Sequence, residues 1–134
     1  MVTIASDLIA RILREAAASP RAEVCGLLFG SADAILAIRP CRNVAADPAR
    51  RFELDPAALF AAHRGARAGG PAMVGHYHSH PTGRATPSPR DAAAAVADGS
   101  LWLIAAAGTV RGWRAVAHGT VEGRFDPVPL DTAT

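Results

Sequence analysis

The hydrophobic positions of this chain follow two different spacings, and each spacing predicts a different kind of element. Near the N-terminus apolar residues recur three or four positions apart, and Leu8 and Ile12 belong to a stripe flanked by arginine and glutamate. Continuous apolar runs, which are typical of buried strands, follow further along. We therefore expect helices over residues 7–18, 56–67 and 89–97. Strands are expected over residues 2–4, 23–29, 33–40, 51–54, 72–79, 101–107, 110–117 and 124–129.

Cap and turn residues set the limits of these elements. Ser6 is the expected N-cap of the first helix, and Asp55 caps the second, with Pro56 at its first helical position. Two prolines in segment 124–129 place it at a sheet edge. Because helices alternate with strands and hairpins also occur, the chain is expected to be an α/β (α+β type) protein whose mixed sheet is flanked by helices. Its length favours a single domain over residues 1–134.

Composition and charge exclude several classes of protein. All 14 basic residues are arginine, they are scattered among 12 acids, and the net charge is only +2, so no nucleic-acid partner is expected. No apolar run approaches ~18 residues and no signal peptide precedes the first helix, so a cytoplasmic protein without membrane spans is expected. Two cysteines are too few for a disulfide framework or a four-sulfur zinc site, and reduced thiols are expected.

Candidate metal-ligand chemistry is concentrated between residues 75 and 91. Residues two apart on a strand face the same side, about 6.6 Å from each other, so His78 and His80 can turn towards one ion. Ser88 and Asp91 form an acidic variant of the capping box, in which Asp91 lies in the first turn of the third helix. Alone they would be only a helix cap. So close behind the histidine pair, Asp91 is the candidate third ligand and Ser88 its neighbour.

Two histidines, one aspartate and a water would make a four-coordinate catalytic zinc site with one open position. Such an ion lowers the pKa of its water towards ~7 and polarises a carbonyl oxygen, but a hydrolase also needs a general base. Glu23 is the candidate base because it is the one acid at the head of a strongly apolar strand. The alternative is that Glu23 lies just outside that strand, in solvent.

Several residues near the motif have a structural interpretation. His76 shares the face of His78, but a fourth protein ligand would close the site to water, so we expect it to pack beneath the metal and hydrogen-bond a ligand. Ser79 points to the other face and is the second candidate for a supporting contact. Tyr77 is expected in the core on that face. Cys25 shares a face with Glu23, and a buried thiol is expected rather than a thiolate ligand.

At this point the sequence resembles a known family, the JAMM (MPN+) metalloproteases. The residues that carry the resemblance are a glutamate ahead of a hydrophobic strand, His-Ser-His-Pro, and then Ser and Asp at fixed spacing, which are found here as Glu23, His78, His80, Ser88 and Asp91. Residues 23–28, 42–45, 51–56 and 77–81 also read like the small stand-alone bacterial members. The resemblance covers roughly residues 3–117, which leaves 118–134 as an edge segment and tail.

The resemblance implies a role for each matching residue. His78, His80 and Asp91 would bind one zinc ion. Glu23 would act as general base and then general acid, and Ser88 would donate to the oxyanion of the tetrahedral intermediate. The implied fold is a curved mixed sheet of the cytidine-deaminase-like kind with helices packed around it.

The resemblance also implies a class of substrate. Family members cleave peptide or isopeptide bonds, often after the Gly-Gly tail of ubiquitin or a ubiquitin-like protein. The small bacterial ones are similar to peptidases that release cysteine or another adduct from ThiS/MoaD-like sulfur carriers. The chain is too short for the insertions that give linkage specificity, so a narrow groove for an extended tail is expected, with strand addition to a sheet edge. An exposed sheet edge also leaves a homodimer open.

Two other functions remain as alternatives. Two histidines and one carboxylate also form the facial triad of non-haem iron oxygenases, although those usually have all-β folds. A non-catalytic MPN-type interaction module would share the fold but lack metal ligands, and all of them are present here. Zinc deaminases are excluded because the Pro-Cys-x-x-Cys pair is absent.

Overall fold

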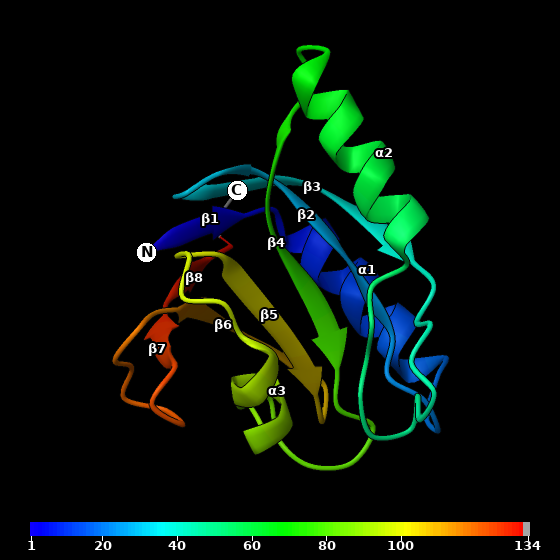
Figure 1. Cartoon of the computed structure of the whole chain (residues 1–134). Helices are drawn as coiled ribbons and strands as arrows, with labels where there is room; N and C mark the ends of the chain where they lie inside the picture. The colour runs from blue at the N-terminus through cyan, green and yellow to red at the C-terminus, as the bar shows by residue number, and fades with distance from the viewer. Residues whose placement is uncertain (133–134) are drawn as a thin grey trace.

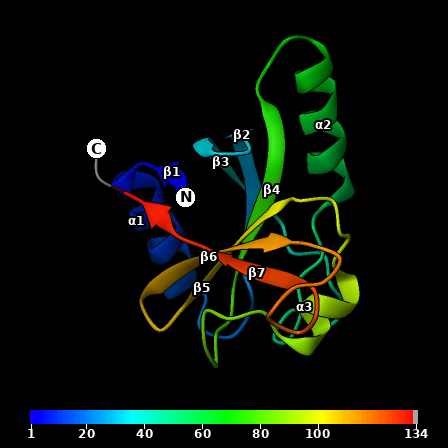
Figure 2. The ribbon, with the colours of Figure 1, turned by 90° about the vertical axis from the view of Figure 1, so that its left-hand side faces the viewer.

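A computed structural model describes residues 1–132, in which eight strands form one mixed sheet, curved and strongly twisted (Figures 1 and 2). The order across the sheet is β7-β6-β5-β4-β2-β3-β1-β8. Three neighbouring pairs are parallel, β1 with β3, β1 with β8 and β4 with β5, and the others are antiparallel. The strands are β1 (Val2–Ile4), β2 (Cys25–Ser31), β3 (Ala34–Cys41), β4 (Ala72–Ser79), β5 (Leu101–Ala106), β6 (Thr109–Ala115), β7 (Phe125–Val128) and β8 (Leu130–Asp131).

Three helices cover the two faces of this sheet. Helix α1 (Ser6–Ala17) lies behind the sheet in Figure 1, whereas α2 (Pro56–Arg67) and α3 (Pro89–Ala94) lie in front of it. The mixed α/β architecture and the curved sheet that the sequence predicted are thus confirmed. No helix within residues 1–132 is long and apolar enough to cross a membrane.

Alternation along the central strands decides which residues each helix covers. The α1 face holds one core cluster, in which Leu28 of β2 and Tyr77 of β4 pack with Leu8 and Ile12 of the helix. The opposite face carries Leu27 and Phe29 beneath α2, and Trp102 and Ile104 in the cluster towards α3. His76 and His78 belong to this second face, because His76 pairs with Leu27 across the ladder. The candidate chemistry therefore lies on the face away from α1.

The expected core role of Tyr77 is confirmed, since its side chain is fully buried. Its hydroxyl donates a 2.8 Å hydrogen bond to Glu15 on α1. Its ring lies directly over Gly26 of the neighbouring strand, where a Cβ would come within 2.3 Å of the ring carbons. Gly26 is thus required by close packing between β2 and β4.

The start of the first helix and the segment 51–54 differ from the sequence-based expectations. The N-cap of α1 is Ala5, without a side-chain cap, so Ser6 is already helical. Segment 51–54 is a loop that touches the preceding segment by a single bridge between Asn43 and Leu54, and it is not a strand. A side-chain amide replaces the expected ladder there, because Asn43 Oδ1 accepts hydrogen bonds from the backbone N–H groups of Ala45 and Glu53.

The third helix and the C-terminal strands also differ. Helix α3 ends at Ala94 rather than at residue 97, because Ala95 is already extended (ψ 136°). The chain then turns at Gly99 (φ 78°), whose N–H donates to Ala115 on β6. Strand β7 confirms that segment 124–129 lies at a sheet edge. Strand β8 has only two residues and was not predicted.

Candidate active site

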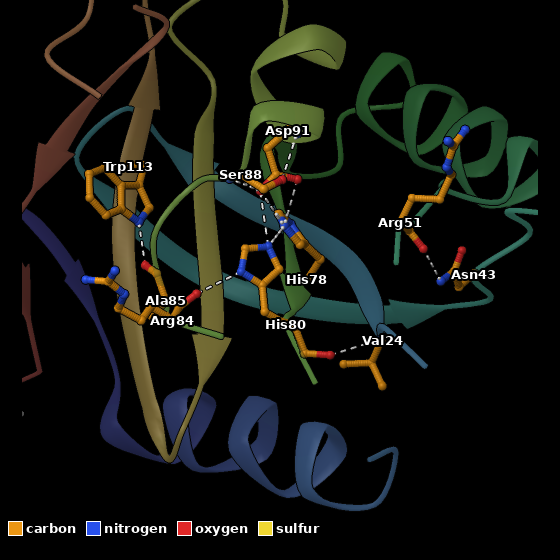
Figure 3. Close-up of polar contacts among 11 residues, drawn as sticks. Val24, Asn43, Arg51, His78, His80, Arg84, Ala85, Ser88, Asp91 and Trp113 are labelled. Carbon is orange, nitrogen blue, oxygen red and sulfur yellow. Dashed lines mark hydrogen bonds and ion pairs between the residues drawn. The ribbon is translucent and has the colours of Figure 1, made fainter. Parts of the chain in front are cut away.

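Three of the predicted side chains converge where β4 ends and α3 begins (Figure 3). His78 lies near the end of β4, His80 follows that strand directly, and Asp91 lies in the first turn of α3. The two Nε2 atoms of His78 and His80 are 3.2 Å apart. Asp91 places Oδ2 3.3 Å from the first of these atoms and 3.1 Å from the second. Three donor atoms thus form a nearly equilateral triangle.

This triangle fits a tetrahedral metal ion. Zinc bonds to nitrogen and oxygen of about 2.0–2.1 Å place neighbouring donor atoms about 3.3–3.4 Å apart in a tetrahedron. The observed separations of 3.1–3.3 Å are close to that value. His78 is fully buried and Asp91 is 6% exposed, so the donors face an enclosed site. Imidazole nitrogen with carboxylate oxygen suits zinc, and three protein donors leave the fourth position open.

The two histidines differ in how their far sides are held: His78 Nδ1 is buried without a hydrogen-bond partner within residues 1–132, whereas His80 has one. His80 Nδ1 donates to the carbonyl oxygen of Arg84 at 2.8 Å, which leaves Nε2 as the lone-pair nitrogen that faces the site. Burial lowers the pKa of His78, so its imidazole is neutral. Burial opposes the ionised form of Asp91, but hydrogen bonds with both histidines outweigh it and hold the pKa of Asp91 well below its usual range. Burial opposes the charged form of His80 as well, but hydrogen bonds with Asp91 and the Arg84 carbonyl raise its pKa. His78 and Asp91 therefore have the protonation state that a metal requires, and an ion bound at His80 would displace a proton.

The predicted capping box is present and holds Asp91 in place. Ser88 is the N-cap of α3, and its Oγ accepts a 3.0 Å hydrogen bond from the backbone N–H of Asp91. The backbone N–H of Ser88 donates in return to Asp91 Oδ2 at 2.9 Å. Because Ser88 Oγ is engaged as an acceptor, its own O–H proton remains to be given to another group.

Glu23 lies two residues before β2, yet its side chain is only 6% exposed. The alternative that placed it in solvent is therefore wrong. Its backbone is held on both sides, since its N–H donates to Pro48 at 2.7 Å and its carbonyl accepts from Asn43 Nδ2 at 2.9 Å. Its Oε1 atom is buried and has no hydrogen-bond partner within residues 1–132. A buried carboxylate oxygen without a partner indicates that something else enters the site.

The acidity of Glu23 is strongly altered. Burial raises its pKa to about 7, and the negative charge of Asp91 adds to the rise, while His80 and Arg90 oppose it. A carboxyl group with a pKa near neutrality can both take and give a proton. Its carboxylate lies within 4.8 Å of the two histidine donors, but no hydrogen bond joins it to either. Glu23 and the two histidines are therefore a group that could hold a metal ion, and the shorter separations of 3.1–3.3 Å favour Asp91 as the third donor.

Ser79 faces away from the two histidines, as the strand alternation predicted, and it has a specific contact there. Its Oγ accepts a 2.9 Å hydrogen bond from the N–H of Val24, and its own N–H donates to the Val24 carbonyl at 3.0 Å. Ser79 is 2% exposed. It joins the end of β4 to the residue directly after Glu23, and so fixes the distance between the carboxylate and the histidines.

His76 packs beneath the site as expected, but without the expected hydrogen bond. Its ring lies 4.8 Å from Phe52 and 4.2 Å from Trp102, and Nε2 has no partner within the described residues. Burial lowers the pKa of His76 to about 3, so the imidazole is neutral.

Cys25 is a buried thiol, as expected. Burial raises the pKa of its thiol well above the usual range, and its sulfur lies 3.9 Å from the Cys41 sulfur.

Two residues that the sequence did not single out contribute to the site. Phe52 stacks on His78 with ring centroids 4.2 Å apart and an interplanar angle of 19°. Asn43 holds Glu23 through one amide hydrogen and the carbonyl of Arg51 through the other, as Figure 3 shows in part. The only local indication for Asn43 was that it is an asparagine in a polar loop. Its role could not be predicted from that, because Glu23 and Arg51 lie 20 and 8 positions away.

Two grooves reach the site from different sides. One has a volume of about 600 Å³ and lies between the 45–53 loop and α3, ending at Asp91. The other, of about 680 Å³, is bounded by residues 80–90 and contains Glu23, His80 and Ser88. Strand β4 itself is paired on both sides, with β2 and β5. Strand β3 pairs with β1 only at Ala34 and Ile35, so its remainder, up to Cys41, is an edge that no described strand covers. Strand addition to a sheet edge, which the sequence suggested, stays a prediction.

Comparisons with known proteins agree with this geometry. Residues 5–116 match the family described as prokaryotic homologs of the JAB domain. Desampylase from Haloferax volcanii is 42% identical over 103 residues, which are 75% of this chain and 74% of that protein. A probable TtuB-protein conjugate cleaving protease from Thermus thermophilus is 40% identical over 82 residues, which are 61% of this chain and 52% of that protein.

A solved structure shares the fold. The crystal structure of a JAB1/MPN domain protein from Archaeoglobus fulgidus superposes with a TM-score of 0.60 at 18% identity, covering 98% of this chain and 95% of that one. The family match spans most of the chain and includes Glu23, the histidine pair, Ser88 and Asp91. The chain therefore belongs to the prokaryotic JAB-domain family and is a JAMM-type hydrolase.

Proposed function

We propose that the protein is a zinc-dependent peptidase or isopeptidase that hydrolyses the amide bond after the Gly-Gly tail of a ubiquitin-like or sulfur-carrier protein. The observation that carries the proposal is the triangle of donor atoms from His78, His80 and Asp91, with the unpartnered Oε1 of Glu23 beside it. The two similar proteins named for desampylation and for TtuB-conjugate cleavage support this class of substrate.

The chemistry divides among five residues. His78, His80 and Asp91 would hold one zinc ion, which supplies Lewis acidity to the scissile carbonyl and to the attacking water. Glu23 takes the proton of that water on its unpartnered Oε1 and then gives it to the leaving nitrogen. A pKa near 7 suits both steps, because the carboxyl group is neither too weak a base nor too weak an acid at neutral pH.

Ser88 is assigned the developing oxyanion. Its Oγ is already an acceptor for the Asp91 N–H, which leaves the hydroxyl proton available for another partner. A donor held by a helix cap is ordered before the substrate arrives, and ordered donors stabilise charge that develops in the transition state. Ser88 also lines the same groove as Glu23 and His80, so donor, base and ligand face one substrate.

The carrier tail is assigned to the groove between the 45–53 loop and α3. Four alanines, Asp91 and four larger residues line it: Ala45, Ala46, Ala93, Ala94, Arg51, Phe52, Glu53 and Arg90. Small side chains on both sides leave room for an extended chain, and two glycines can fit closely where larger residues would not. A carrier that lacks its tail should bind at least tenfold more weakly than the intact carrier. Equal binding of the two would refute this assignment.

The proposed reaction is tested with Glu23→Gln. The substrate is a carrier whose terminal glycine is joined to cysteine or to a lysine side chain, and release is followed by mass spectrometry. Loss of the general base should lower kcat by roughly 10²–10⁴-fold, while the zinc content stays unchanged. Asp33→Asn, an exposed carboxylate-to-amide change at the β2–β3 turn, is the matched control and should keep wild-type activity. Equal turnover by wild type and Glu23→Gln would refute the proposal.

A further inference from the structure

The groove of about 680 Å³, which we call the arginine-lined groove, carries a cluster of positive charge to which the proposed reaction gives no role. The groove between the 45–53 loop and α3 is called the alanine-lined groove. The lining of the arginine-lined groove includes Arg50, Arg84 and Arg90 around the mouth, with Glu122 as the one acidic residue besides Glu23. All three arginines are exposed. Within residues 1–132 none of their guanidinium groups takes part in a hydrogen bond, ion pair or ring contact.

Four other arginines within residues 1–132 do have such partners. Arg39 and Arg64 lie over phenylalanine rings, and Arg111 lies 4.6 Å from the centroid of Trp113. Arg114 donates to the carbonyls of Gly99 and Ala32. The three groove arginines come from two separate segments, residue 50 and residues 84–90, and meet only at this groove. Arg90 interacts electrostatically with Glu23 in the same groove, and the other two arginines have no such interaction within residues 1–132. Like charges gathered around a concave site produce a positive potential that favours an anionic occupant.

The position of the groove identifies which part of the substrate meets this charge. Its floor contains Glu23, His80 and Ser88, whereas the alanine-lined groove approaches Asp91 from the side of the 45–53 loop. Arg90 is the only residue that both grooves share. A substrate that crosses the metal position therefore occupies both, and if the glycine tail fills the alanine-lined groove, the leaving group enters the arginine-lined one.

The size of the arginine-lined groove points to a peptide segment. Its volume of about 680 Å³ lies within the range of roughly 300–1,000 Å³ that accommodates drug-sized ligands, which are larger than one amino acid. Guanidinium groups form paired hydrogen bonds with carboxylates. We infer that the arginine-lined groove binds a segment of the acceptor protein that carries acidic side chains beside the modified lysine. This inference rests on the proposed function.

The test compares acceptor peptides that differ only in the residues beside the lysine. A Gly-Gly-tailed carrier is joined to the lysine side chain of a nine-residue peptide with aspartate and glutamate neighbours, or with asparagine and glutamine instead. At low salt kcat/KM should be roughly tenfold higher for the acidic peptide, as expected for a few exposed charge pairs. In 0.5 M NaCl the ratio of acidic to neutral peptide should fall towards one, because salt screens exposed charges.

Variants connect this preference to the groove. Arg50→Gln combined with Arg84→Gln should lower the acidic-to-neutral ratio to about one, whereas Arg67→Gln, an exposed arginine on α2 outside both grooves, should preserve it. The ratio is measured within one variant, so a general loss of activity does not affect it. If the double variant does not fold, the salt dependence of the wild type still tests the preference.

Two results would overturn the inference. One is equal cleavage of the acidic and neutral peptides by the wild type. The other concerns a carrier joined to a single amino acid, with either a free α-carboxylate or an α-amide. If the arginines mattered only for the preference between these two substrates, the groove would be assigned to a small leaving group. Failure to cleave any of the peptides or amino-acid adducts would refute the proposed function itself.

Discussion

The carboxyl group of Glu23 is reactive because of three features of its position. It is buried, it lies near the negative Asp91, and its Oε1 has no partner within residues 1–132. The first two raise its pKa to about 7, and the third leaves it free to accept a proton. The sequence identified this residue only through its place at the head of an apolar strand and through the family motif. The burial that changes its chemistry comes from segments far along the chain.

His76 provides a test at the residue scale that does not depend on activity. Its pKa is about 3 in the folded protein, compared with 6.5 for an ordinary histidine, so the unfolded chain binds a proton that the folded state rejects. The free energy of unfolding of the metal-free protein is therefore highest above pH 6.5 and falls as pH decreases towards 3. Between pH 6 and 4 this one group should contribute a slope approaching about 1.4 kcal/mol per pH unit.

His76→Phe keeps a ring between Phe52 and Trp102 and removes the titration. Urea unfolding of metal-free protein between pH 7.5 and 4 should show a shallower loss of stability for the variant than for wild type. Parallel pH profiles for the two proteins would show that His76 is protonated in the folded state.

At the scale of elements, the site depends on how the end of β4 is joined to the segment before β2. The hydrogen bond from Val24 N–H to Ser79 Oγ forms this joint, and the amide of Asn43 holds Glu23 from the other side. Alternation predicted that Ser79 would face away from the histidines. Its partner could not be predicted, because Val24 is 55 positions earlier in the chain.

Ser79→Ala should loosen Glu23 without disturbing the metal ligands. The Val24 N–H would lose its partner in a partly buried place, which should lower the free energy of unfolding by about 1 kcal/mol. We expect kcat to fall by roughly tenfold with little change in KM, because a misplaced base affects the transition state more than binding. The zinc content should stay at the wild-type level.

Ser31→Ala is the control for this change, since Ser31 is exposed at the end of β2 and its hydroxyl makes no hydrogen bond within the described residues. An unchanged kcat in Ser79→Ala, with stability lowered as expected, would mean that the hydrogen bond supports the fold but not the base.

At the scale of the whole molecule, much of the fold followed from local patterns. The three helices, the 2–4 strand, the β2–β3 hairpin and the strand that carries the histidines were predicted from spacing and turn residues. The order of strands was not, because it is set by pairing between distant segments such as β2 with β4. For the same reason the sequence predicted which residues form the site but not the contacts of Asn43 and Phe52, which depend on how the 42–54 loop folds over β4.

The central claim is that His78, His80 and Asp91 hold one zinc ion and that Glu23 acts beside it without binding it. The most direct measurement is the metal content of protein purified without added metal, by inductively coupled plasma mass spectrometry. We expect one zinc per chain in the wild type and in Glu23→Gln, and less than a tenth of that in His80→Ala and Asp91→Ala. Iron in place of zinc, no metal in the wild type, or loss of metal in Glu23→Gln with retention in Asp91→Ala would contradict the account.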